Sequence, residues 1–222
     1  MLVLALDTTT AAGSAAVAED GNVVELAPID PSAPVATQVP GVLAALLDRQ
    51  RMALADIDVF AVATGPGSFT GLRIGIAAMQ GLALARHKPL IGVSAFDALA
   101  ALAAAPRVGV WIDAWRGEVY VAWYEQGRQV GAAAVLPADA ALQDMPPGAV
   151  PDGIVFVGDG AVKYRPRIPH PVIDPTPLLA GAVAREAWAR ARRGETPPPH
   201  AIRPLYVRRP DAELARERKP SA

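Results

Sequence analysis

The chain has 222 residues and a mass of 23.1 kDa, which corresponds to one large domain or two small ones. Its 52% hydrophobic and 19% charged residues supply the apolar surface of a folded core, which excludes disorder of the whole chain. The absence of cysteine excludes disulfide bonds, thiolate metal sites and cysteine nucleophiles. A formal net charge of -1 excludes a whole-molecule field that attracts nucleic acid or an anionic membrane.

The first residues, MLVLALD, lack a basic segment and soon reach the carboxylate of Asp7. This pattern predicts a buried strand rather than a signal peptide. No later stretch reaches the roughly 20 uninterrupted apolar residues that a membrane helix needs. We therefore expect a cytoplasmic protein that does not enter a membrane.

The first half of the chain has the pattern of regular α/β structure. Apolar runs predict strands, EDGN at 19–22 predicts a hairpin turn, and helical spacing of Val39, Leu43 and Leu46 predicts a long helix. Ser94 is expected to cap a later helix. The expected strands are 2–6, 13–18, 22–26, 57–63 and 89–93, and the expected helices are 37–51, 72–86 and 94–105.

The second half is richer in proline and again opens with strands. The expected strands are 108–113, 118–124, 129–135 and 154–158, followed by a helix over 178–193. Two successive units that open with antiparallel strands indicate a duplicated α/β domain with a cleft between the copies. We expect an N-terminal lobe over 1–105, a C-terminal lobe over 106–200 and a tail over 201–222 that packs back on the N-terminal lobe.

The first strand delivers a carboxylate and three hydroxyls to the turn that follows it. In phosphate-binding folds such a turn directs backbone N–H groups at a phosphate while the aspartate holds a metal ion or water. The alternative is a structural turn that Asp7 caps. Because no glycine stands at Thr8 or Thr9, the backbone cannot easily approach a phosphate, which favours the structural interpretation.

The second motif is the glycine-rich run TGPGSFTGLRIG at 64–75, between an expected strand and an expected helix. A P-loop is excluded because no Lys-Ser or Lys-Thr pair follows Gly71. A dinucleotide fingerprint is disfavoured because the next strand ends at Ser94 without an acidic residue. Ser68 is no nucleophile elbow, since Pro66 and Thr70 stand where glycines are required.

Metal ligands are scarce in this sequence. His87, His170 and His200 are scattered, so we expect no metal site and no metallopeptidase activity. Asp113 and Asp159 stand at strand ends, where capping is the common role, although both can face a cleft.

These motifs resemble those of the TsaB (YeaZ) family, bacterial relatives of the glycoprotease-like TsaD proteins. The resemblance spans nearly the whole chain. It rests on LALDTTT at 4–10, GPGSFTGLRIG at 65–75, PLIGVS at 89–94, Asp113 with RGEVY at 116–120, GDG at 158–160 and PLYVR at 204–208. The chain departs from many relatives at 35–38, where it has VATQ and they carry a His-Ser pair.

The resemblance implies an actin-like ATPase fold of the sugar-kinase type. It also implies a non-catalytic subunit, without a cofactor, that pairs with TsaD and the ATPase TsaE to place threonylcarbamoyl on the tRNA adenosine next to the anticodon. Self-association is expected when TsaD is missing, and contact with tRNA is expected to be indirect. The vestigial nucleotide-site candidates are Asp7, Thr8, Thr9, Thr10, Asp113 and Asp159. The alternative function is a nucleotide hydrolase that acts through Asp7 and a bound metal ion.

Small residues recur at helical spacing after the glycine motif, which lets a second helix approach closely. Two explanations stay open: tight packing on the lobe's own sheet, or a helix-to-helix interface with TsaD that includes the helix 37–51. The second predicts that Ala78 and Met79 face outward. The interface candidates are Val39, Leu43, Leu46, Gly71, Gly75, Ala78 and Met79.

Overall fold

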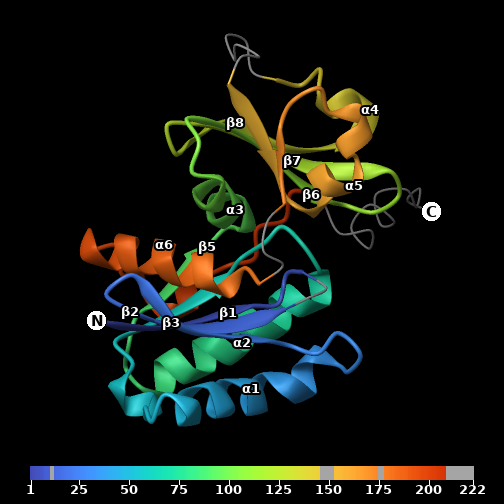
Figure 1. Cartoon of the computed structure of the whole chain (residues 1–222). Helices are drawn as coiled ribbons and strands as arrows, with labels where there is room; N and C mark the ends of the chain where they lie inside the picture. The colour runs from blue at the N-terminus through green and yellow to red at the C-terminus, as the bar shows by residue number, and fades with distance from the viewer. Residues whose placement is uncertain (11–12, 146–152, 175–177, 209–222) are drawn as a thin grey trace, which may run out of the picture.

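The computed structural model of the chain describes residues 1–10, 13–145, 153–174 and 178–208. It contains two five-stranded sheets, each in its own lobe (Figure 1). Helices α1 (Val35–Arg49) and α2 (Phe69–Ala85) cover one face of the first sheet, and α3 (Ala95–Ala103) and α6 (Ala180–Arg192) lie between the two sheets. Helices α4 (Ala138–Ala141) and α5 (Asp159–Lys163) cover the far face of the second sheet.

The first sheet has the strand order β3-β2-β1-β4-β5. Strands β2 and β3 form the predicted hairpin, β1 also pairs antiparallel with β2, and β4 and β5 add parallel to β1. These central strands are buried on both faces, which explains why their sequences are continuous apolar runs. The strands are β1 (Leu2–Asp7), β2 (Ser14–Glu19), β3 (Asn22–Pro28), β4 (Val59–Ala63) and β5 (Leu90–Val93).

The second sheet repeats this topology with the order β10-β9-β6-β7-β8. Strands β6, β7 and β8 pair antiparallel, and β9 and β10 add parallel to β6. The expected duplication of an α/β unit is therefore confirmed. The strands are β6 (Arg107–Asp113), β7 (Glu118–Glu125), β8 (Arg128–Pro137), β9 (Ile154–Val157) and β10 (Val172–Ile173).

The long helices follow the predicted segments, and serine caps start two of them. The Ser68 hydroxyl accepts a hydrogen bond from Gly71 N at 3.2 Å, and the Ser94 hydroxyl accepts one from Asp97 N at 2.9 Å. The sequence patterns missed two short helices and strand β10, which are too short to show a period. The helices are α1 (Val35–Arg49), α2 (Phe69–Ala85), α3 (Ala95–Ala103), α4 (Ala138–Ala141), α5 (Asp159–Lys163) and α6 (Ala180–Arg192).

Helix α6 does not pack within the lobe to which its sequence position assigned it. It contacts β1, β2 and β4 of the first sheet, and Ala180 N donates to the buried Ser14 hydroxyl at 3.0 Å. The predicted C-terminal lobe over 106–200 is corrected accordingly, because its last helix returns to cover the first sheet. The packed strands, not the chain order, decide where an amphipathic helix buries its apolar side.

A polar network joins the layer of α3 and α6 to both lobes. Arg190 of α6 donates to Asp97 of α3 at 2.7 Å and to the Gly92 carbonyl of β5 at 3.0 Å. The Tyr124 hydroxyl of β7 donates to the same Asp97 at 2.6 Å. Around this network, apolar side chains from both sheets form one continuous core.

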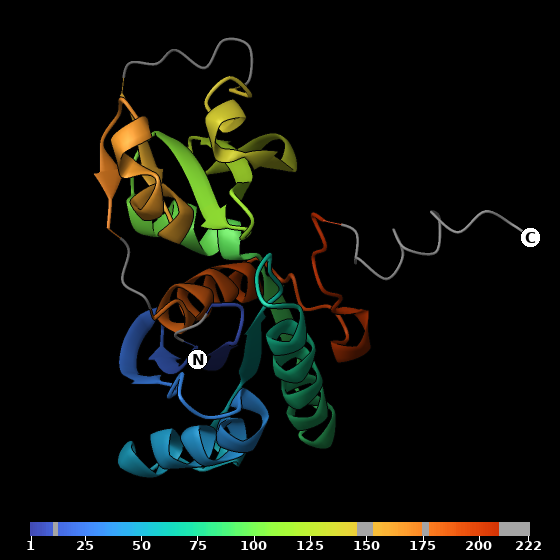
Figure 2. The ribbon, with the colours of Figure 1, turned by 90° about the vertical axis from the view of Figure 1, so that its right-hand side faces the viewer.

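The described part of the C-terminal segment contacts both lobes (Figure 2). Ile202 is buried in the core of the first lobe, and Leu205 N donates to the Thr64 carbonyl at 2.7 Å. Arg208 reaches the second lobe, where it donates to the Ala114 carbonyl at 3.1 Å. The predicted packing of the tail on the N-terminal lobe agrees with the contacts of Ile202 and Leu205 but leaves out the contact of Arg208 with the second lobe. Residues 209–222 of the predicted tail lie outside the described residues.

Among the described residues, no helix combines the length and the apolar character that crossing a membrane requires.

Candidate functional site

The carboxylate of Asp7 ends strand β1 and is fully buried. Its Oδ1 accepts hydrogen bonds from Thr9 N at 2.8 Å and from the Thr9 hydroxyl at 2.6 Å, and its Oδ2 accepts one from the Thr10 hydroxyl at 3.1 Å. Burial raises the pKa of the Asp7 carboxyl, and the bonds from Thr9 and Thr10 oppose that rise. The Asp7 carboxylate thus accepts hydrogen bonds from residues of the turn that follows it.

The glycine-rich segment 64–75, here called the glycine loop, lies directly against this turn. Ser68 N donates to the Thr9 carbonyl at 2.8 Å, and the Thr8 hydroxyl donates to the Gly71 carbonyl at 2.7 Å. A Cβ added at Gly71 would stand 2.0 Å from Thr8 O, and one at Gly75 would stand 2.3 Å from Thr8 Oγ1. The glycines are therefore required by the close approach of helix α2 to the turn, and the two sequence motifs form one packed unit.

This packing corrects the expectation that Gly71 and Gly75 face a partner helix. Both are buried against Thr8 of their own chain. It also bears on the phosphate-turn hypothesis, because Thr8 and Thr9 are buried and the Thr9 amide is used by Asp7. Asp7, Thr8 and Thr9, which are buried, therefore offer no accessible group to a phosphate or a metal ion.

The structure brings Asp113 and Asp159 together in the second lobe. Asp159 Oδ1 accepts from Asp113 N at 2.9 Å and from Gly160 N at 2.8 Å, while Asp113 Oδ2 pairs with Lys163 Nζ at 2.8 Å. Burial raises the pKa of the Asp159 carboxyl. No hydrogen bond or ion pair among the described residues links either aspartate to Asp7, and these residues contain no cluster of three or more metal-ligating side chains.

Replacing Asp7 with asparagine tests the buried carboxylate through the pH dependence of stability. The folded-state pKa of Asp7 lies above the unfolded value of about 3.9. The protonated carboxyl therefore stabilises the wild type below that pH, and this stabilisation is lost as the pH rises through the folded-state pKa. The amide that replaces the carboxylate does not titrate. In urea unfolding from pH 4 upward, the stability of Asp7→Asn relative to the wild type should therefore increase with pH. A difference that stays flat or decreases with pH would contradict the assigned environment.

Several predicted interface residues turn out to be core residues. Val39, Leu43 and Leu46 of α1 and Met79 of α2 are buried in the core beneath the first sheet, and Ala78 is half-buried at its edge. The correction has a simple cause: apolar spacing marks the buried side of a helix, and here that side faces the chain's own sheet.

The outward side of these two helices carries several small residues beside larger ones such as Arg73 and Leu84 of α2, both of which are exposed. Ala77 and Gly81 of α2 and Gly41 of α1 are exposed, and a Cβ added at either glycine has no atom within 4 Å. The interface candidates chosen from the sequence did not include Gly41, Ala77 or Gly81. The sequence shows a glycine inside a predicted helix at positions 41 and 81. Only the coordinates show that neither glycine is needed for packing within the described chain.

Comparison with known proteins gives a family match, over residues 27–216, to the family described as TsaD: tRNA N6-adenosine threonylcarbamoyltransferase. The chain is 37% identical over 216 residues to an uncharacterized protein of Mycobacterium tuberculosis, covering 95% of this chain and 93% of that protein. It is also 42% identical over 133 residues to the tRNA threonylcarbamoyladenosine biosynthesis protein TsaB of Escherichia coli, covering 57% and 56% of the two chains.

The solved structure of YeaZ from Pseudomonas aeruginosa matches with a TM-score of 0.77 and 33% identity, covering 92% of this chain and 99% of that one. An activator of 2-hydroxyisocaproyl-CoA dehydratase matches with a TM-score of 0.53 at 12% identity, which shows the fold alone. The two duplicated lobes are thus those of the actin-like ATPase fold. The chain belongs to the TsaD family and, within it, to the TsaB (YeaZ) group.

Proposed function

We propose that this chain is a non-catalytic subunit that binds and supports TsaD, together with the ATPase TsaE, in making threonylcarbamoyladenosine on tRNA. The observation that carries the proposal is the state of Asp7. In a working phosphate site the aspartate needs access to a metal ion or water, whereas here three hydrogen bonds from its own turn engage a fully buried carboxylate. The names of the relatives, which concern threonylcarbamoyladenosine biosynthesis, support the pathway.

The outward side of α1 and α2 supports the choice of partner surface. Glycine inside a helix is less favourable than alanine by about 0.5 to 1 kcal/mol, and no contact within the described chain accounts for Gly41 or Gly81. Small exposed residues allow two helices to pack closely. We propose that TsaD packs on this side, and that a second copy of the chain takes its place when TsaD is missing.

Reconstitution tests the function directly. TsaD and TsaE from the same organism are combined with substrate tRNA, threonylcarbamoyl donor and ATP, with or without this chain, and modified nucleoside is measured by mass spectrometry. Product should form only when this chain is present, and Asp7→Asn should leave its amount largely unchanged. Equal product without the chain, or product from this chain alone, would contradict the proposal.

The alternative function, nucleotide hydrolysis, gives a separate prediction. The purified chain should release no phosphate from ATP above the background rate, because Asp7, Thr8 and Thr9 are buried under the glycine loop. Phosphate release is measured with and without Mg²⁺. Turnover that disappears in Asp7→Asn would establish the hydrolase in place of the scaffold.

A further inference from the structure

Exposed aromatic rings from three separate parts of the chain gather at one end of the molecule. Phe69 starts α2, Tyr206 lies in the C-terminal segment, and Trp115 lies in the turn between β6 and β7. Their exposed fractions are 42%, 39% and 55%, in the order Phe69, Tyr206 and Trp115. Most large apolar side chains of the described chain are buried, so this concentration of exposed rings needs an explanation.

Two of these rings form an ordered cluster with an arginine. The rings of Phe69 and Tyr206 stack with centroids 5.5 Å apart. Arg73 Cζ lies 4.0 Å from the centre of the Phe69 ring, and Arg73 Nε donates to the Tyr206 hydroxyl at 3.2 Å. Within the described chain this guanidinium contacts a ring and a phenol, and neither of these groups neutralises its positive charge.

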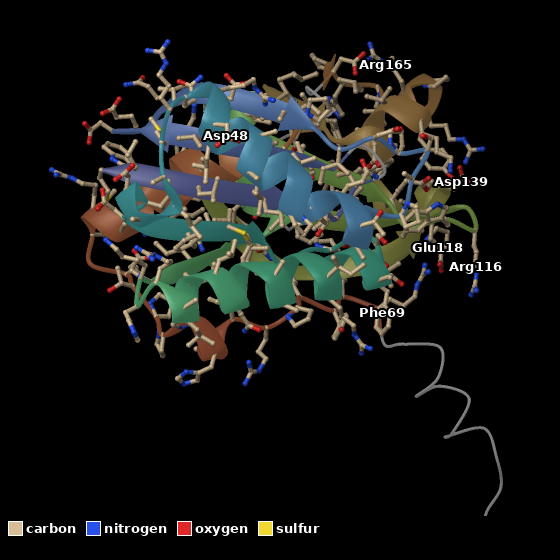
Figure 3. All side chains as sticks on the ribbon, turned by 90° about the horizontal axis from the view of Figure 1, so that it is seen from below. Asp48, Phe69, Arg116, Glu118, Asp139 and Arg165 are labelled. Atoms are coloured by element: carbon tan, nitrogen blue, oxygen red, sulfur yellow. The ribbon has the colours of Figure 1, made fainter. Side chains whose placement is uncertain are left out.

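Arg208 holds the turn of Trp115 beside this cluster. It donates to the carbonyl of Ala114 at 3.1 Å and to the carboxylate of Glu118, which flank the turn. Because Arg208 is only two residues beyond Tyr206, their Cα atoms lie within about 7 Å of each other. Figure 3 shows Phe69, Glu118 and Arg116 at the same end of the molecule.

The turn between β6 and β7 holds Trp115 and Arg116 in an unfavourable backbone conformation. Trp115 and Arg116 have φ angles of 57° and 56°, a region that Asn and Gly tolerate better than Trp or Arg. The indole of Trp115 is more than half exposed, so burial in this chain does not explain it. By contrast, Trp111 and Trp123 of the same lobe are buried in its core. Strained residues of this kind are concentrated at binding sites.

This end of the molecule is rich in arginine, although the whole chain carries a net charge of only -1. The guanidinium groups of Arg73, Arg116 and Arg208 lie here together with the carboxylates of Glu118, Asp139 and Asp113, of which Asp113 accepts a hydrogen bond from Trp115 N and pairs with Lys163. Exposed aromatic rings interleaved with arginine guanidinium groups are typical of surfaces that bind single-stranded nucleic acid, where bases stack on the rings and phosphates meet the cations. Aromatic residues and arginine are also enriched at protein interfaces, so a protein contact is the competing outcome of the test.

We propose that this surface, formed by Phe69, Arg73, Trp115, Arg116 and Tyr206, binds a single-stranded stretch of RNA. This inference rests on the proposed function, because it makes the tRNA substrate of the complex the source of that RNA. A base stacks on the exposed indole of Trp115, and neighbouring phosphates lie against Arg73 and Arg116. The subunit then contributes a direct contact to the tRNA instead of acting only through TsaD.

The test uses the complex of this chain with TsaD and a fluorescently labelled anticodon stem-loop RNA. Fluorescence anisotropy gives the Kd at several salt concentrations, and gel filtration confirms that each variant still forms the complex. Trp115→Ala should weaken RNA binding about fivefold or more, as expected for the loss of one stacked base. Arg116→Gln should lower the slope of log K against log salt by about 0.7. The matched control Val24→Ala, an exposed apolar residue on strand β3, should bind RNA like the wild type.

RNA affinity and salt slope that are unchanged in both variants, with complexes intact, would overturn the inference and leave the proposed function standing. Variants that lose TsaD or TsaE while keeping RNA affinity would identify a protein contact and also overturn it. A wild-type chain that forms no complex with TsaD would instead refute the proposed function, so the two failures are distinguishable.

Discussion

Replacing Gly71 with alanine should lower the free energy of unfolding by about 3 kcal/mol, the upper end of the range for overpacking. The added Cβ would stand 2.0 Å from the Thr8 carbonyl oxygen, a backbone atom that cannot move without displacing the turn and Asp7. Helix α2 would have to retreat from strand β1, and the hydrogen bond from the Thr8 hydroxyl to the Gly71 carbonyl would be lost. Urea unfolding followed by circular dichroism measures the change.

The same substitution ten residues later in this helix provides the control. A Cβ at Gly81 has no atom within 4 Å, so Gly81→Ala should raise the free energy of unfolding by about 0.5 to 1 kcal/mol. Opposite signs for two Gly→Ala changes in one helix separate close packing from helix propensity. If both variants are stabilised, Gly71 does not hold the packing contact that the structure assigns to it.

Replacing Ala77 with arginine should weaken binding to TsaD by about a hundredfold or more. If TsaD packs on the outward side of α2, the new guanidinium is buried without a partner, which costs about 3 kcal/mol or more. Ala77 is exposed in the free chain, so the monomer has room for the longer side chain. Isothermal titration calorimetry or surface plasmon resonance with purified TsaD measures the loss, and gel filtration reports self-association of the chain.

Ala132→Arg is the matched control, because Ala132 is exposed on strand β8 of the other lobe and should bind TsaD normally. Both variants should keep the circular dichroism spectrum and the cooperative melt of the wild type. Met79→Arg, by contrast, should unfold the chain, since Met79 is fully buried. Normal TsaD binding by folded Ala77→Arg would remove α2 from the proposed interface.

The sequence predicted much of the secondary structure because the signals are local. Continuous apolar runs marked the strands buried on both faces, and Ser94 marked the start of α3 through a hydrogen bond within three residues. The same local signals failed for α5 and β10. Their five and two residues span too little chain for a period to appear.

The candidate site was predicted in its parts and not in its assembly. Asp7, Thr8 and the glycine motif were each recognised as unusual, but nothing in their order shows that Thr8 fills the space left by Gly71 and Gly75. The sequence shows that a glycine lacks a Cβ, but it does not show whether the atom beside that glycine belongs to the same chain or to a partner. For this reason the interface hypothesis placed the wrong side of α2 outward.

The amino-acid sequence by itself determined the two repeated α/β units, the buried first strand ending in Asp7 and the membership of the TsaB group, because each follows from local periodicity or from the identity of residues in a motif. Only the tertiary structure decided that the Asp7 carboxylate bonds to its own turn, that α6 covers the first sheet, that Phe69 stacks on Tyr206, and that Arg208 bonds beside Trp115. These features depend on contacts between residues far apart in the chain. Apolar burial selects them only when all the elements pack together.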